Sequence, residues 1–279
     1  MSGNQLMNKY LKFPETSFGP LETSVSTNLV IEKQLFGETI RLSDFGIVDT
    51  YPEDISPMFS WMQNLELPQK PTILDIGANV GMFSLSYASM FDDAEIHCFE
   101  PVPFIYNYLS QNLELNPNLS SKMHAHNLGL SNCVERNKLS IPVPQQHERY
   151  SKELDIRLYS VLGEGEEKFS AQFMPIDRWV DNFKIHSLDF IKIDVEGHEY
   201  SVLEGASKTL LSFRPLVMFE LNQLTLALSS RTADEYLRFA TDHGYQVFGL
   251  EYGYKSDLLA IDSVEQVGLV SDLILFPSQ

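Results

Sequence analysis

The stretch Thr72-Ile73-Leu74-Asp75-Ile76-Gly77-Ala78-Asn79-Val80-Gly81 decides the fold of this chain. Its apolar start has the character of a buried strand, and the sequence MFSLSYASM at residues 82–90 has the character of a helix. Gly77, Asn79 and Gly81 stand in the turn, where small residues let the backbone approach a ligand and the next helix offers free amide groups. The stretch therefore predicts a strand, a ligand-binding loop and a helix.

A carboxylate follows the next predicted strand. The strand predicted at residues 95–99 ends in Glu100, 19 residues after Gly81. A carboxylate at the end of the second strand can accept hydrogen bonds from both ribose hydroxyls of a nucleoside cofactor. Asn127 follows the third predicted strand, and it either reads the adenine edge or belongs to an ordinary turn.

The loop also distinguishes between two classes of cofactor. A dinucleotide would place its pyrophosphate at the glycine loop, where the charge of Asp75 is unfavourable. S-adenosylmethionine has no phosphate and carries a sulfonium and an ammonium, so an acid at the entry to the loop is favourable. The residues predicted to bind S-adenosylmethionine in this part of the chain are Asp75, Gly77, Asn79, Gly81, Glu100 and Asn127.

Short apolar strands alternate with amphipathic helices from residue 71 onward. This alternation predicts an α/β fold with a doubly wound, mostly parallel sheet, whose ligands bind at the carboxyl ends of the strands. We expect residues 71–279 to form this Rossmann-like domain. An insertion around residues 141–172 is expected to carry one or two strands near RLYSVL at 157–162.

The first 70 residues are expected to form an N-terminal arm and an α/β cap segment. Residues 1–28 are polar and rich in turn-forming residues, which predicts a flexible or loosely docked arm. Residues 28–47 alternate apolar and polar side chains around Gly37, which predicts a hairpin or short strands. Residues 52–66 have the apolar spacing of a helix.

Composition argues against several kinds of partner. The 279 residues include 20 basic and 38 acidic side chains, so the net charge of −18 repels nucleic acids and anionic lipid surfaces. Cys98 and Cys133 lack the spacing of a zinc site, and neither a signal peptide nor a membrane-length apolar run is evident. We expect a cytoplasmic protein without a nucleic-acid or membrane partner.

Ionisable groups gather after the predicted strand FIKI at residues 190–193. Asp194 follows this strand, and His198 opens the next helix, whose N-terminus disfavours a charged histidine. Both are predicted catalytic residues, Asp194 is also placed beside the cofactor, and Glu199 is expected to stabilise the helix start. The next strand ends in Glu220 and Asn222, so Asp194, Glu220 and Asn222 together offer oxygen ligands for Mg²⁺.

The two motifs together, DIGANVG at residues 75–81 and FIKIDVEGHEYSVLEGA at residues 190–206, resemble the FkbM family of methyltransferases. The resemblance covers about residues 71–222. It implies a class I methyltransferase fold and O-methylation of a small hydroxylated molecule such as a sugar or polyketide. For related enzymes that use a divalent ion, it implies ligands at Asp194, Glu220 and Asn222, although Glu stands where such sites more often have Asp.

Three other functions stay open from the sequence. N-methylation or protein methylation would use the same fold, but the Asn/Asp-Pro-Pro-Tyr or -Phe turn of many amino-methylating enzymes is not found near the fourth strand. A cofactor-binding protein without catalysis is disfavoured by the ionisable groups at residues 194–199, and a dehydrogenase is disfavoured by Asp75. The predicted reaction is in-line attack of an acceptor oxygen on a methyl group, assisted by His198 or Asp194.

Overall fold

The computed structural model describes residues 23–25, 30–35, 37–43, 61–62, 64–140, 168–222, 226–227, 229–250, 258–268 and 270–278. Most of the helix predicted at residues 52–66 and the strand predicted at 157–162 lie outside these ranges, while Trp61 and Met62 are helical. Within these ranges, no helix combines the length and apolar character needed to cross a lipid bilayer.

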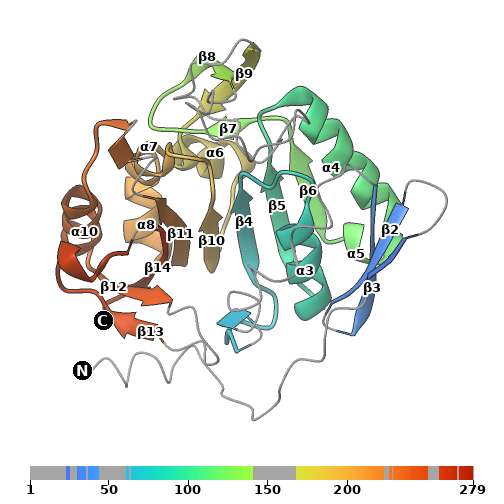
Figure 1. The fold of residues 1–279 in the computed structure, drawn as a ribbon, viewed down its shortest axis with the longest axis horizontal. Coiled ribbons are helices and arrows are strands. Elements are labelled where there is room, and N and C mark those ends of the chain that lie inside the picture. Colours follow the sequence, from blue (N-terminus) through green and yellow to red (C-terminus); the bar gives the residue numbers. More distant parts are fainter. Residues whose placement is uncertain are drawn as a thin grey trace, which may run out of the picture.

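In the described part of the chain, an eight-stranded sheet organises the fold (Figure 1). Its neighbouring parallel strands are β6 (Met123–His126), β5 (Glu95–Phe99), β4 (Thr72–Ile76), β10 (Phe190–Ile193) and β11 (Leu216–Asn222). The antiparallel part consists of β14 (Val270–Pro277), which lies between β11 and β12 (Tyr245–Leu250), and β13 (Leu258–Ala260) at the edge. The predicted doubly wound, mostly parallel sheet is confirmed.

Helices cover both faces of this sheet. Those on the first face are α3 (Met82–Met90), α4 (Pro103–Leu115) and α5 (Pro117–Ser120). Those on the second face are α6 (Ile176–Phe183), α7 (Glu199–Glu204), α8 (Ser207–Phe213) and α10 (Ala233–Asp242), with the short helix η3 (Val264–Gln266) beside α10. Along β4, Ile73 joins the first core and Leu74 joins the second, because successive strand residues point to opposite faces. Burial on both faces explains the continuous apolar runs in the sequence.

A small N-terminal sheet lies along α4. It consists of β1 (Thr23–Val25), β2 (Val30–Leu35) and β3 (Glu38–Ser43), which confirms the predicted hairpin around Gly37. Within the predicted flexible or loosely docked arm, residues 23–25 are docked, because this segment pairs with β2 and its backbone groups join the sheet.

Two asparagines of α4 attach β3 to the helix. Asn116 accepts a hydrogen bond from Arg41 N (2.8 Å) and donates one to Arg41 O (2.6 Å), and Asn112 accepts one from Ser43 N (2.7 Å). These amides satisfy backbone groups on an edge of β3 that no strand covers in the described ranges. Ile40 of β3 is buried in the core that α3 and α4 share with the large sheet.

A third sheet lies beyond the carboxyl ends of the parallel strands (Figure 1). It consists of β7 (Gly129–Leu130), β9 (Lys168–Met174) and β8 (Glu135–Ser140), in that order. β9 begins inside the predicted insertion, whose residues 141–167 lie outside the described ranges. Leu139 and Phe173 of this sheet pack with Val102 and Ile105, so β8 and β9 contact the loop after β5 and the start of α4.

The close approach of β4 and β10 depends on Gly77 and generates a stability prediction. Gly77 has a φ of +80°, and a Cβ atom there would overlap the backbone oxygen of Asp194. We expect Gly77→Ala to lower the free energy of unfolding by about 3 kcal/mol or more, because left-handed strain adds to a clash with backbone.

The matched control is Gly37→Ala. Gly37 has a similar φ of +84°, but nothing lies within 4 Å of a Cβ atom there. We expect only the cost of the left-handed backbone, about 1–2 kcal/mol. Urea denaturation measures both losses, and equal losses would contradict the importance of the close strand approach.

Candidate functional site

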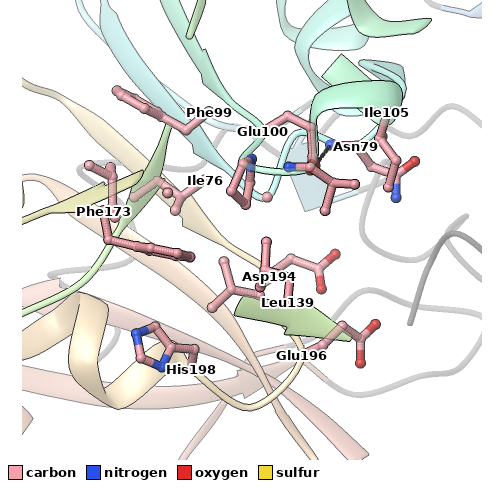
Figure 2. Close-up of a pocket in the computed structure, with 16 residues that line it drawn as sticks. Ile76, Asn79, Phe99, Glu100, Ile105, Leu139, Phe173, Asp194, Glu196 and His198 are labelled. Carbon is pink, nitrogen blue, oxygen red and sulfur yellow. Dashed lines mark hydrogen bonds between the residues drawn. The ribbon is translucent and has the colours of Figure 1, made fainter. Parts of the chain in front are cut away.

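A cavity opens at the carboxyl ends of β4, β5 and β10, and β7, β8 and β9 complete its wall (Figure 2). Its lining residues are Ile76, Gly77, Asn79, Phe99, Glu100, Pro101, Val102, Ile105, Gly129, Leu130, Leu139, Phe173, Asp194, Val195, Glu196 and His198. The structure therefore brings together Gly77, Asn79, Glu100, Asp194 and His198, which were predicted from two separate motifs and from the end of the second strand.

Glu100 holds the loops on two sides of the cavity. Its Oε2 accepts a hydrogen bond from Asn79 N at 3.1 Å, and its Oε1 accepts one from Val102 N at 2.8 Å. Burial raises the pKa of Glu100 to about 7, although both backbone hydrogen bonds oppose the rise. Each carboxylate oxygen has a second lone pair, so Glu100 has the capacity to accept two ribose hydroxyls as well.

The glycine loop turns with the help of Asn79. This residue has a φ of 51°, and its own Oδ1 accepts a hydrogen bond from Val80 N at 2.8 Å. Asn112 donates to Val80 O at 2.7 Å, which ties the loop to α4. Gly81 precedes α3 and packs against Leu109, so it shapes the turn without lining the cavity.

Asp75 does not reach the cavity. It is fully buried on the α3 face of the sheet, where Ser84 Oγ donates to its Oδ2 at 2.5 Å and Lys192 Nζ lies 3.5 Å from its Oδ1. A side chain in the middle of a strand must point to one face of the sheet, and here it points into the core. The predicted direct contact of Asp75 with the cofactor is therefore not supported.

Asp194 places a carboxylate at the cavity, opposite Glu100 and Asn79 (Figure 2). Its side chain is 39% exposed, and its Oδ2 lies 3.2 Å from Lys192 Nζ. Lys192 is itself buried, with its ammonium 4.3 Å from the centre of the Phe83 ring. Lys192 was not singled out from the sequence, because its partners become visible only when β4 and β10 are in register.

The predicted Mg²⁺ site is not supported. The Lys192 ammonium already lies beside the Asp194 carboxylate, where a divalent cation would have to bind. Glu220 and Asn222 lie on β11, yet among the residues that the structure describes no three or more histidine, cysteine, aspartate or glutamate side chains are arranged to hold a metal ion. The described carboxylates therefore give no support for a Mg²⁺ ion at this edge of the sheet.

His198 lies on the wall beside Phe173. Its Nε2 is 2.9 Å from Ser131 Oγ, and the rings of His198 and Phe173 meet edge to face with centroids 6.1 Å apart. Burial lowers the pKa of His198, and the negative charge of Glu135 opposes this effect. The neutral imidazole expected from the helix start is thus favoured by burial.

Glu199 fixes the loop between β10 and α7, a role beyond the helix stabilisation expected of it. Its Oε1 accepts hydrogen bonds from Val195 N at 3.2 Å and Gly197 N at 3.0 Å, and Glu196 between them has a φ of 53°. Burial raises the pKa of Glu199 to about 7. Since Val195 and Glu196 line the cavity, Glu199 shapes it from behind.

Asn127 supports the site without lining it. Its Nδ2 donates to Glu100 O at 2.9 Å and to Pro101 O at 3.2 Å, so it fixes the loop after β5. The sequence left open whether Asn127 contacts the adenine edge or belongs to an ordinary turn. The observed position fits the turn residue better.

The apolar wall of the cavity was not predicted. Leu139 and Phe173 reach it from β8 and β9, and Ser131 is the partner of His198. These residues flank the insertion and belong to no motif. The available signal is the strand-like alternation of KFSAQFM at residues 168–174, of which residues 168–172 fall within the predicted insertion.

Comparisons with known proteins identify the family. The family model described as Methyltransferase FkbM domain matches residues 75–247. Methyltransferase sdnD of Sordaria araneosa is 31% identical in an alignment 169 residues long that covers 51% of this chain and 62% of that protein. Methyltransferase 1 of Beauveria bassiana is 27% identical in an alignment 166 residues long that covers 50% of this chain and 59% of that protein. The chain thus spans less than two-thirds of the length of either relative.

A crystal structure of the FkbM methyltransferase from Methylobacillus flagellatus KT aligns with a TM-score of 0.47 and 18% identity, over 76% of this chain and 45% of that chain. The family match is the stronger finding, because it includes the glycine loop and the segment after β10 and covers more than half of the sequence. The chain therefore belongs to the FkbM family of S-adenosylmethionine-dependent methyltransferases.

Proposed function

We propose that this chain transfers the methyl group of S-adenosylmethionine to a hydroxyl oxygen of a small molecule. The observation that carries the proposal is the buried carboxylate of Glu100, which faces a cavity that the glycine loop and Asp194 also line. When bound, S-adenosylmethionine supplies an electrophilic methyl group on a sulfonium. The net charge of −18 favours a neutral or cationic small acceptor over a nucleic acid.

The order of the strands supports one orientation of the cofactor. Glu100 would hold the ribose at the end of β5, and Leu130 and Phe173 on the side of β7 and β9 offer an apolar wall for adenine. The ends of β4 and β10 would then face the methionine part, where the Asp194 carboxylate favours a positive sulfonium. The cavity thus has an apolar end and an acidic end.

Asp194 is the better placed of the two predicted bases. It lies at the acidic end, where the acceptor hydroxyl must meet the methyl group, and a carboxylate there can take the hydroxyl proton. His198 interacts with Ser131 and Phe173 at the apolar end, which supports a role in holding adenine. The other lining residues orient the two reactants, and such orientation contributes roughly 7–11 kcal/mol.

Binding and turnover test the proposed function together. In calorimetry, S-adenosylhomocysteine should bind saturably and NAD should not. When the protein is incubated with S-adenosylmethionine and a panel of hydroxylated sugars and polyketides, mass spectrometry should detect a methylated product. Methylation of amines or proteins alone would contradict the proposal of a hydroxyl acceptor. Binding of NAD alone would overturn the cofactor assignment.

Glu100 should make cofactor affinity depend on pH. Its pKa of about 7 lies above the ordinary value, so the carboxyl is mostly protonated at pH 6 and mostly ionised at pH 8. Ribose hydroxyls donate to the ionised form, so S-adenosylhomocysteine should bind about tenfold more tightly at pH 8 than at pH 6 in calorimetry.

Two glutamate-to-glutamine variants check this assignment. Glu100→Gln should bind S-adenosylhomocysteine more weakly and lose the pH dependence, because an amide does not titrate in this range. Glu114→Gln, on the exposed side of α4, should keep both the affinity and the pH dependence. If the dependence persists in Glu100→Gln, another group causes it.

The two ends of the cavity predict different kinetic defects. Asp194→Asn should lower kcat by about 10²–10⁴-fold, the range for a lost proton transfer. His198→Ala should raise the KM for S-adenosylmethionine by roughly fivefold, the equivalent of one lost hydrogen bond, with little effect on kcat. Steady-state kinetics with an acceptor identified in the panel separate the effect on kcat from the effect on KM. The reverse pattern would make His198 the base.

A further inference from the structure

A buried ammonium lies between two carboxylates behind the cavity. Lys192 Nζ is 3.5 Å from Asp75 Oδ1 and 3.2 Å from Asp194 Oδ2. Asp75 is 0% exposed and Lys192 is 2% exposed, whereas the side chain of Asp194 is 39% exposed at the cavity. These three residues, here called the charged row, run from the core of the sheet to the acidic end of the site.

The fold holds the charged row in place. Asp75 and Lys192 are directly paired on β4 and β10, so their side chains share one face of the sheet. From α3, Ser84 Oγ donates to Asp75 Oδ2 at 2.5 Å, and the Phe83 ring lies 4.3 Å from the Lys192 ammonium. Charges at this depth persist only when they are paired, because an isolated buried charge loses its hydration.

We propose that Asp75 and Lys192 are positioning residues that set the charge which Asp194 presents to the cofactor, an inference that rests on the proposed function. Asp75 balances the Lys192 ammonium, and Lys192 holds the Asp194 carboxylate at the edge of the cavity. With two carboxylates and one ammonium, the charged row keeps a net negative charge, and Asp194 is where that charge meets the cavity. The acid of the glycine loop thus acts through Lys192 and not by contact with the cofactor.

Two ligands that differ by one methyl group and one positive charge test this inference without an acceptor. S-adenosylmethionine is a sulfonium and S-adenosylhomocysteine is a neutral thioether, so the ratio of their dissociation constants reports the charge beside the sulfur atom. A substitution that only distorts the site weakens both ligands and leaves the ratio unchanged. Calorimetry at pH 8, above the pKa of about 7 for Glu100, keeps the ribose contact in its ionised form.

We expect different outcomes from the two single variants. Asp75→Asn leaves the ammonium without its buried partner and should lower the preference for the sulfonium on the order of tenfold. Lys192→Met removes the ammonium together with the counter-charge that stabilises a buried Asp75 carboxylate, so only the Asp194 charge remains and the ratio should stay within about threefold of the native value. The double variant Asp75→Asn/Lys192→Met loses one charge of each sign, so its ratio should return to within about twofold of the native value.

Lys192→Arg retains the positive charge and should keep the native ratio. An unchanged ratio in Asp75→Asn would overturn the inference, as would a double variant that does not recover. If circular dichroism shows that Lys192→Met does not fold, Asp75→Asn decides alone, since its preference for the sulfonium must fall. Failure of both ligands to bind the native protein would refute the proposed function instead, so the two failures are distinguishable.

Discussion

The carboxyl ends of β4 and β10 lie so close that no side chain fits between them at Gly77, and the rest of the site depends on this contact. Asp194 N donates to Ile76 O at 2.9 Å, and Gly77 N donates to Phe99 O at 3.0 Å. Backbone hydrogen bonds therefore join the ends of β10, β4 and β5. Because these strand ends are fixed together, residues from distant parts of the sequence face one cavity.

Buried carboxylates hold the surrounding loops by accepting backbone N–H groups. Glu100 joins the glycine loop to the loop after β5, and Glu199 joins two N–H groups of the loop after β10. For both residues, the cost of burying a charge outweighs the backbone hydrogen bonds, and the pKa rises to about 7. Loop geometry and local charge are therefore linked near neutral pH at this cavity.

The sheet and the two motifs could be predicted because their signals are local in the sequence. The glycine turn and Glu100 at a strand end are recognised within about 30 residues, the length of one strand-helix-strand unit. The direction of each side chain could not be predicted in the same way. Asp75 points into the core, Asn127 turns to backbone carbonyls, and Lys192 finds its partners only through the register of two strands that are distant in sequence. Phe173 enters the cavity from beyond an insertion, where no motif marks it.

The side chain of Asn112 on α4 links β3 of the N-terminal sheet to the glycine loop. Its Oδ1 accepts a hydrogen bond from Ser43 N of β3, its Nδ2 donates to Val80 O of the glycine loop, and the side chain is fully buried. A shortened protein beginning at residue 71 would leave this buried oxygen without its β3 partner and uncover the apolar surface that Ile40 protects. We therefore expect the smallest unit that folds with an intact glycine loop to extend to β3, although the family match begins only at residue 75.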